Sequence, residues 1–160
     1  MRRLPDPPEF PMRIEGSYSI DAPAERVWDV LLDPESLQAC IPGVQSMTET
    51  GENAWKIVLT IGIAAFKGTY EGDVRIADAV APQKYDIHVE GKGRPGWVRG
   101  VGHIQLVPND ANTQTTVNVA GEATLGGPVF AIGSRFAAPA AKLLMGQFFG
   151  AMKERVERAA

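Results

Sequence analysis

The stretch that decides the fold covers residues 126–158, GGPVFAIGSRFAAPAAKLLMGQFFGAMKERVER. It is the only segment of the chain that is long and periodic enough to form a helix of several turns. Gly126 and Gly127 run into Pro128, whose fixed φ and missing amide proton suit the first position of a helix. We therefore expect a long C-terminal helix that a sheet must grip.

Pro139 divides this helix into two halves. Proline removes a helical hydrogen bond and crowds the preceding turn, so we expect a kink or two abutting helices there. Each half has its own apolar stripe, and the two stripes do not line up at about 100° per residue. One half is therefore expected to pack on a sheet while the other borders an opening, and ordinary core packing of both stripes is the alternative. The stripes are Val129, Ile132, Gly133 and Phe136, then Ala141, Met145, Phe148, Phe149, Met152 and Val156.

The N-terminal third predicts one strand followed by two short helices. Apolar and polar residues alternate from Met12 to Asp21, as in a half-buried strand. Residues 22–32 carry an apolar side typical of a short amphipathic helix. Asp33 and Pro34 then predict an N-cap and the first turn of a second helix, which ends before a turn imposed by Ile41-Pro42-Gly43.

From Val44 to Leu125 the pattern predicts strands only, six of them in an antiparallel meander. Alternation assigns one face of each strand to the interior. The predicted inward residues are Met47, Trp55, Ile57, Leu59, Ile61, Phe66, Tyr70, Val74, Ile76, Tyr85, Ile87, Val89, Val98, Ile104, Leu106, Val117, Val119, Ala123 and Leu125.

The same alternation places many glycines on the inward face, where a core normally needs bulk. A glycine in a strand marks a bend or a close approach by another group. One explanation is that the glycines let the sheet curve around the helix. The other is that they leave a cavity for a ligand, and the two explanations are compatible. The glycines are Gly68, Gly72, Gly91, Gly93, Gly100, Gly102 and Gly121.

Composition excludes several classes of protein. The net charge is −3 without a cluster of Lys or Arg, so nucleic acid is not an expected partner. No apolar run approaches the roughly 20 residues that span a bilayer. The single cysteine, Cys40, forms no internal disulfide, and the N-terminus lacks the apolar core of a secretion signal, so the cytoplasm is the expected location. Prolines within residues 1–11 predict a flexible tail, followed by one domain over residues 12–160.

Catalytic constellations are missing from the sequence. His88 and His103 alternate with inward residues and are expected to face solvent. Cys40 has no flanking base and is expected to be a small buried residue. The glycine-rich, basic run over residues 91–96 joins two predicted strands and is expected to form a mobile hairpin. We therefore expect no catalytic residue, no metal site and no cofactor.

Several short motifs resemble the CoxG family, the G subunits of carbon monoxide dehydrogenase, within the SRPBCC, or START-like, superfamily. The resemblance covers Met12 to about Arg155, and its most specific parts are the Ile-Pro-Gly turn and the Gln-Phe-Phe of the last helix. The motifs are Ile20-Asp21-Ala22-Pro23-Ala24-Glu25-Arg26-Val27-Trp28, Cys40-Ile41-Pro42-Gly43, Phe66-Lys67-Gly68, Gly91-Lys92-Gly93, Gly126-Gly127, Gly133-Ser134-Arg135 and Gln147-Phe148-Phe149.

This resemblance implies an α+β helix-grip fold, in which a seven-stranded curved antiparallel sheet wraps around the long C-terminal helix. It also implies a non-catalytic accessory protein that binds a hydrophobic ligand, a quinone or a lipid-like molecule, and assists or recruits a molybdenum-containing carbon monoxide dehydrogenase-type enzyme. Contact with the inner face of the cell membrane would be peripheral at most. The expected ligand-binding residues are Trp55, Leu59, Phe66, Tyr70, Trp97, Phe130, Phe136, Leu144 and Phe148.

Two other functions remain open at this stage. One is an enzyme of the cyclase or hydratase type found in the same superfamily, for which Tyr70 and Tyr85 are the inward polar candidates. The other is a pure protein–protein adapter that docks a partner through Trp97 or through the apolar stripe after Pro139.

Overall fold

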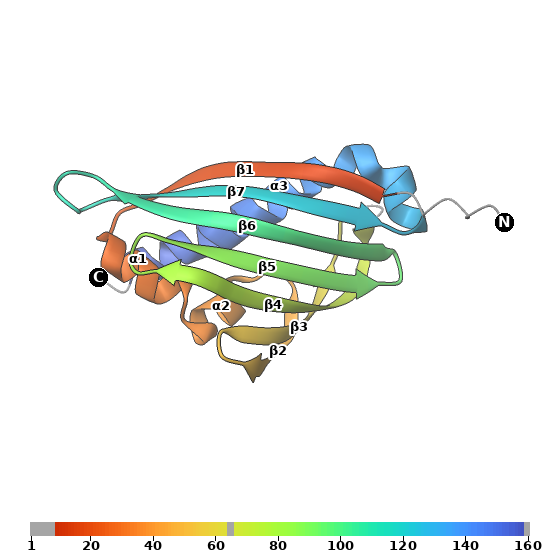
Figure 1. Ribbon diagram of the computed structural model, residues 1–160, viewed down its shortest axis with the longest axis horizontal. Helices are drawn as coiled ribbons and strands as arrows, with labels where there is room; N and C mark the ends of the chain where they lie inside the picture. The colour runs from red at the N-terminus through yellow and green to blue at the C-terminus, as the bar shows by residue number, and fades with distance from the viewer. Residues whose placement is uncertain (1–8, 64–65, 159–160) are drawn as a thin grey trace.

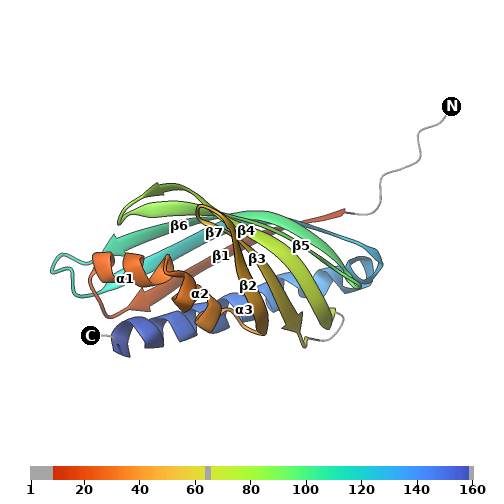
Figure 2. The same cartoon turned by 90° about the horizontal axis from the view of Figure 1, so that it is seen from below.

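The computed structural model describes residues 9–63 and 66–158, with side chains described for 11–63, 66–127 and 135–158. One antiparallel sheet curves over a long C-terminal helix, and two short helices close one end (Figures 1 and 2). The elements are β1 (Glu9–Ile20), α1 (Ala24–Leu31), α2 (Pro34–Cys40), β2 (Val44–Gly51), β3 (Ala54–Ile61), β4 (Gly68–Val80), β5 (Lys84–Gly93), β6 (Gly96–Pro108), β7 (Thr115–Gly126) and α3 (Pro128–Arg158).

The sheet has seven strands in the order β1-β7-β6-β5-β4-β3-β2. β2 to β7 form the predicted meander, and β1 adds to β7 from Glu9↔Gly126 to Ile20↔Thr115. Because successive side chains point to opposite faces of a strand, this register puts the predicted apolar set on the concave face. Trp55, Ile57 and Tyr85 of that set are buried, and the prediction of the fold class is confirmed.

Capping and turn chemistry explain the two short helices. The Asp33 carboxylate accepts hydrogen bonds from the Ser36 amide (3.1 Å) and from the Ser36 hydroxyl (2.8 Å), which caps α2 as predicted. Gly43 ends the turn after α2 with φ +72°, and a Cβ there would lie 2.1 Å from the Thr60 carbonyl oxygen. The Thr60 amide donates to the Gly43 carbonyl (2.9 Å). Only glycine permits this contact between the turn and β3.

The core lies where the C-terminal half of α3 meets β1, α1 and α2. Met152 and Val156 are fully buried, and Phe149 stacks on Tyr18 with ring centroids 4.5 Å apart. A polar link fastens the same end, because Arg155 Nε donates to Ser36 Oγ (2.8 Å), which in turn donates to the Asp33 carboxylate. Figure 2 shows both short helices beside this end of α3.

Two expectations change in the structure. The first strand begins at Glu9 rather than at Met12, since residues 9–12 pair with 123–126 of β7. The rest of the predicted tail lies outside the described residues. α3 is a single helix that contains Pro139, so two separate helices do not form there.

Candidate functional site: an apolar cavity between the sheet and α3

A cavity of about 500 Å³ lies between the concave face of the sheet and α3. Its walls come from alternate residues of the strands, and its roof comes from one side of α3, where Ala137, Ala140, Ala141 and Leu144 face inward. The turn between α2 and β2 contributes Ile41 and Pro42. This volume lies within the range of about 300–1,000 Å³ that small-molecule sites occupy.

The structure brings six of the predicted ligand-binding residues to this cavity. They come from β3, the segment before β4, β4 itself and α3, which are far apart in the sequence. The alternation of the strands predicted most of them, and the apolar stripe after Pro139 predicted Phe148. The six are Trp55, Leu59, Phe66, Tyr70, Leu144 and Phe148.

Phe136 was expected at the cavity, and the structure places it elsewhere. Its side chain is 56% exposed, and the Arg135 guanidinium lies 5.2 Å from the centre of its ring. Ala137, about 100° further around the helix, faces the cavity instead. The apolar stripe of α3 that ends at Phe136 therefore does not mark the side of the helix that faces the cavity at that position. Phe130 lies outside the residues whose side chains are described.

Trp97 was also expected at the cavity, and it lies on the outer face of the sheet. Its neighbour Val98 points inward, so alternation turns Trp97 outward. A Cβ on Gly126 would lie 2.3 Å from the indole ring, which shows that the ring covers this glycine of the adjacent strand. Trp97 therefore protects a bare part of the outer face, an arrangement known as aromatic rescue of a glycine.

Other cavity residues were not predicted as ligand-binding. Leu37, Ile41 and Pro42 come from α2 and the turn that follows, and Met12 and Ile14 come from β1. Alternation in β1 could have indicated Met12 and Ile14. The turn at Ile41-Pro42-Gly43 is a recognisable motif, but it has no periodicity that would assign its side chains to the interior. Only the tertiary structure brings that turn to the cavity.

The inward glycines separate into two kinds. A Cβ on Gly72 would lie 2.4 Å from the Glu90 carbonyl oxygen, and one on Gly100 would lie 2.8 Å from the Glu122 carbonyl oxygen. Backbone atoms leave no space for a side chain there, so these two glycines permit the curvature of the sheet and present bare backbone to the cavity. A Cβ on Gly91 would make only an ordinary contact, 3.4 Å from a methyl of Val98. Gly91 leaves room in the cavity, so both explanations from the sequence apply at different positions.

The polar chemistry of the cavity is limited. The Tyr70 hydroxyl donates to the Phe66 carbonyl (2.7 Å), and burial raises the pKa of this phenol. Tyr85 packs edge-on against Trp28 outside the cavity, and burial raises its pKa as well. Both phenols therefore stay protonated at neutral pH. Within the described part of the chain, no three His, Cys, Asp or Glu side chains group in a way that would hold a metal ion.

Cys40 and His103 lie away from the cavity. Cys40 is buried at the end of α2, where burial raises the pKa of its thiol and the Arg155 charge opposes that shift. Such a thiol is a poor nucleophile. His103 is on the outer face, where its Nδ1 lies 2.7 Å from an Asp86 carboxylate oxygen.

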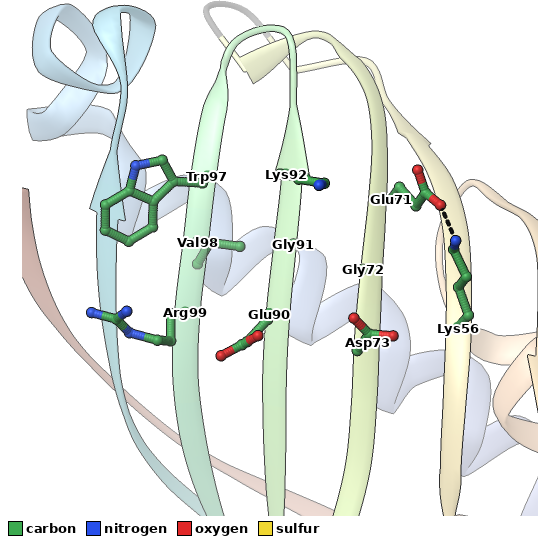
Figure 3. A pocket seen from close by; sticks show the side chains of 10 residues that line it. All are labelled: Lys56, Glu71, Gly72, Asp73, Glu90, Gly91, Lys92, Trp97, Val98 and Arg99. Atoms are coloured by element: carbon green, nitrogen blue, oxygen red, sulfur yellow. Dashed lines mark ion pairs between the residues drawn. The ribbon is translucent and has the colours of Figure 1, made fainter. Parts of the chain in front are cut away.

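A second, smaller groove of about 390 Å³ lies on the outer face of the sheet, with α3 behind it (Figure 3). Several of its charged side chains interact with their neighbours. Lys56 forms an ion pair with Glu71, which raises the pKa of the lysine and lowers that of the carboxyl, and Arg99 lies 5.5 Å from the centre of the Trp97 ring. Gly72 and Gly91 border both this groove and the inner cavity, so only the backbone separates the two there.

The family of the chain is decided by a family model for the G subunit of carbon monoxide dehydrogenase (CoxG), which matches residues 16–157. The chain belongs to the CoxG family. No protein among those with curated descriptions matches it. For this CoxG protein, the motifs quoted from the sequence fall inside the matched range, including the turn at Ile41-Pro42-Gly43 and the segment at Gln147-Phe148-Phe149.

Solved structures show the same fold. A conserved protein from Geobacillus kaustophilus is 37% identical, with a TM-score of 0.88, over 92% of this chain and 97% of that one. A START superfamily protein from Mycobacterium smegmatis matches with a TM-score of 0.70 at 12% identity over 92% and 99% of the two chains. Norcoclaurine synthase from Thalictrum matches with a TM-score of 0.65 at 15% identity, over 95% of this chain and 98% of that one. The last two similarities show that the CoxG chain has the START-like helix-grip fold.

No described helix of the chain has the length and apolar character that a bilayer-spanning helix requires.

Proposed function

We propose that this CoxG protein is a non-catalytic accessory protein that binds a hydrophobic ligand, a quinone or a lipid-like molecule, in the cavity between the sheet and α3. The observation that supports this most strongly is the cavity itself, about 500 Å³ in volume and bordered by apolar side chains from β3, β4 and α3. Burial of apolar surface contributes roughly 25 cal/mol per Å². Burial of the apolar surface of a ligand that fills this cavity therefore provides the free energy for binding.

Membership of the CoxG family supports a role beside a molybdenum-containing carbon monoxide dehydrogenase-type enzyme. In this proposal the protein carries the apolar molecule for that enzyme or recruits the enzyme, with at most peripheral contact with the membrane. The enzymatic alternative has little support in the cavity, because the Tyr70 hydroxyl is already hydrogen-bonded to Phe66. If a substrate were found, Tyr70→Phe would have to abolish its turnover for that alternative to stand.

The test uses the protein purified from its own host, analysed by native mass spectrometry, with melting temperatures measured after addition of quinones and lipid extracts. We expect a bound apolar adduct and a higher melting temperature, because a ligand that binds only the native state stabilises it. No adduct and no shift with any of these molecules would contradict ligand binding.

A matched pair of variants locates the ligand. Ala141→Phe adds a ring inside the cavity, and Ala138→Phe adds the same ring on the exposed side of α3. We expect only Ala141→Phe to abolish the adduct. Co-purification of a dehydrogenase with Ala141→Phe would show that docking does not need the ligand, and would favour the adapter.

A further inference from the structure

A continuous path of glycines crosses the floor of the cavity diagonally. Gly72 and Gly91 are register partners on β4 and β5, and Gly102 and Gly121 are partners on β6 and β7. Gly100 joins the two pairs, since it pairs with Val89, two residues along β5 from Gly91. All these residues border the cavity, and we call the five glycines the glycine furrow.

The dimensions of the furrow set the shape of what it can hold. It crosses from β4 to β7 and advances by about four residues along the strands. With about 4.8 Å between strands and about 3.4 Å per residue, it is about 20 Å long. An extended chain advances about 1.2 Å per bond, so about sixteen bonds would fill the furrow. The small side chains of Ala137, Ala140 and Ala141 lie on the opposite wall. A path of this length suits an extended, flexible chain better than a compact ring system.

The chemistry of the walls points in the same direction. Trp55 and Tyr70 are the two buried wall residues among the described side chains that carry a polar group, and the Tyr70 hydroxyl already donates to the Phe66 carbonyl. Glu90 and Glu122 also border the cavity, but both are exposed, and Figure 3 shows the Glu90 carboxylate on the outer face. Quinone oxygens or a charged head would lose their hydrogen bonds with water on entering, and the walls offer few donors in return. A hydrocarbon loses nothing.

We propose that the glycine furrow holds an extended hydrocarbon chain, prenyl or acyl, whose polar head stays outside the cavity, and that Gly91 determines how long a chain can bind. This inference rests on the proposed function. Gly91 lies second in the path, one strand from its β4 end, has an ordinary strand backbone, and has space in front of its Cα. A side chain there would shorten the furrow from its β4 end without disturbing the strand.

The first experiment compares chains and heads by pairwise competition in native mass spectrometry. The probes are farnesol and geranylgeraniol, dodecanol and hexadecanol, and a benzoquinone without a tail. Affinity should increase about fourfold for each added methylene until the furrow is full, and the tail-less quinone should not compete. A tail-less quinone that displaces hexadecanol would overturn this inference while supporting the proposed function. If none of these probes binds and lipid extracts do not bind either, both this inference and the proposed function are overturned.

The alcohol series separates the two sources of the chain, because a preference for geranylgeraniol over hexadecanol identifies a prenyl cargo and the reverse identifies an acyl cargo.

Gly91→Leu then tests the role of Gly91. It should lower the affinity for the longer alcohols at least tenfold and leave dodecanol nearly unaffected.

Lys92→Leu is the control, since it adds the same side chain to the next residue on the outer face (Figure 3). Equal chain preference in Gly91→Leu and Lys92→Leu would overturn the assignment of Gly91. If Gly91→Leu fails to fold, Gly91→Ala takes its place, with a smaller shift in the same direction expected.

Discussion

The two halves of α3 have different surroundings, although both are rich in apolar residues. Toward the C-terminus, Phe149, Met152 and Val156 are at most 3% exposed and pack against β1 and the two short helices. Nearer the N-terminus, Phe136 and Leu143 are 56% and 51% exposed, and the opposite side of the helix borders the cavity. One end of the molecule therefore supplies stability, and the other end supplies space for a ligand.

The sizes of the facing side chains explain this difference. At the packed end, Tyr18 of β1 stacks on Phe149, and Met145 lies so close to Gly16 that a Cβ there would be 2.9 Å from its methyl. At the hollow end, alanines of α3 face glycines of β4 to β7. Small residues on both surfaces cannot fill the distance between a helix and a sheet. The cavity is thus a consequence of residue volume at specific positions.

The largest expected effect is at the packed end. Met152→Ala should lower the free energy of unfolding by about 2–5 kcal/mol, because it leaves a cavity in a fully buried site. Urea denaturation followed by circular dichroism measures this loss. The affinity of the folded protein for its ligand should not change. A loss below about 1 kcal/mol would show that this end is not the source of stability.

At the hollow end, Leu144→Ala should have the opposite effects, a small loss of stability and a clear loss of ligand affinity. Leu144 already borders open space, so its truncation removes fewer contacts and should cost only about 1 kcal/mol of unfolding free energy. Ligand affinity should fall, since the side chain forms part of the wall. The same denaturation experiment, combined with ligand titration, measures both quantities. A stability loss equal to that of Met152→Ala would contradict the distinction between the two ends.

The smallest effect concerns pH and the last turn of α3. Glu157 accepts hydrogen bonds from Lys153 (2.5 Å) and from the Asp21 amide (2.9 Å), and these bonds, first of all the one from Lys153, hold the pKa of its carboxyl below the ordinary 4.5. A carboxyl whose pKa is lower in the folded state stabilises the protein above its unfolded pKa. The contribution is lost as the pH falls through the folded value.

Glu157→Gln should therefore have a slightly lower melting temperature than the natural protein at neutral pH, and the two curves should converge as the pH falls through the lowered pKa of Glu157. Glu52→Gln, in the exposed turn between β2 and β3, is the control and should follow the natural protein throughout. A difference between Glu157→Gln and the natural protein that persists in acid would mean that Glu157 acts by packing rather than by charge.

Much of the fold could be predicted from local patterns. Alternation from Trp55 to Leu125 identified the concave face, and the pair Asp33-Pro34 identified the start of α2, because these signals depend on nearest neighbours in the chain. The error at Phe136 depends on geometry beyond the single element, and the error at Trp97 does not. Phe136 belongs to an apolar stripe, but the rotation of α3 over the sheet turns it to solvent. Trp97 is aromatic and near the glycine-rich hairpin, but it follows Gly96 and precedes the inward Val98, so alternation along β6 already places it on the outer face.

The sequence by itself determined the order of elements, the inward set of strand residues and the excess of glycine on that face, since each follows from periodicity and residue type. Only the tertiary structure decided which glycines permit curvature and which leave room. That distinction depends on whether a backbone carbonyl or open space lies in front of each Cα, as at Gly72 and Gly91. It is set by the coiling of neighbouring strands, which no single stretch of sequence encodes.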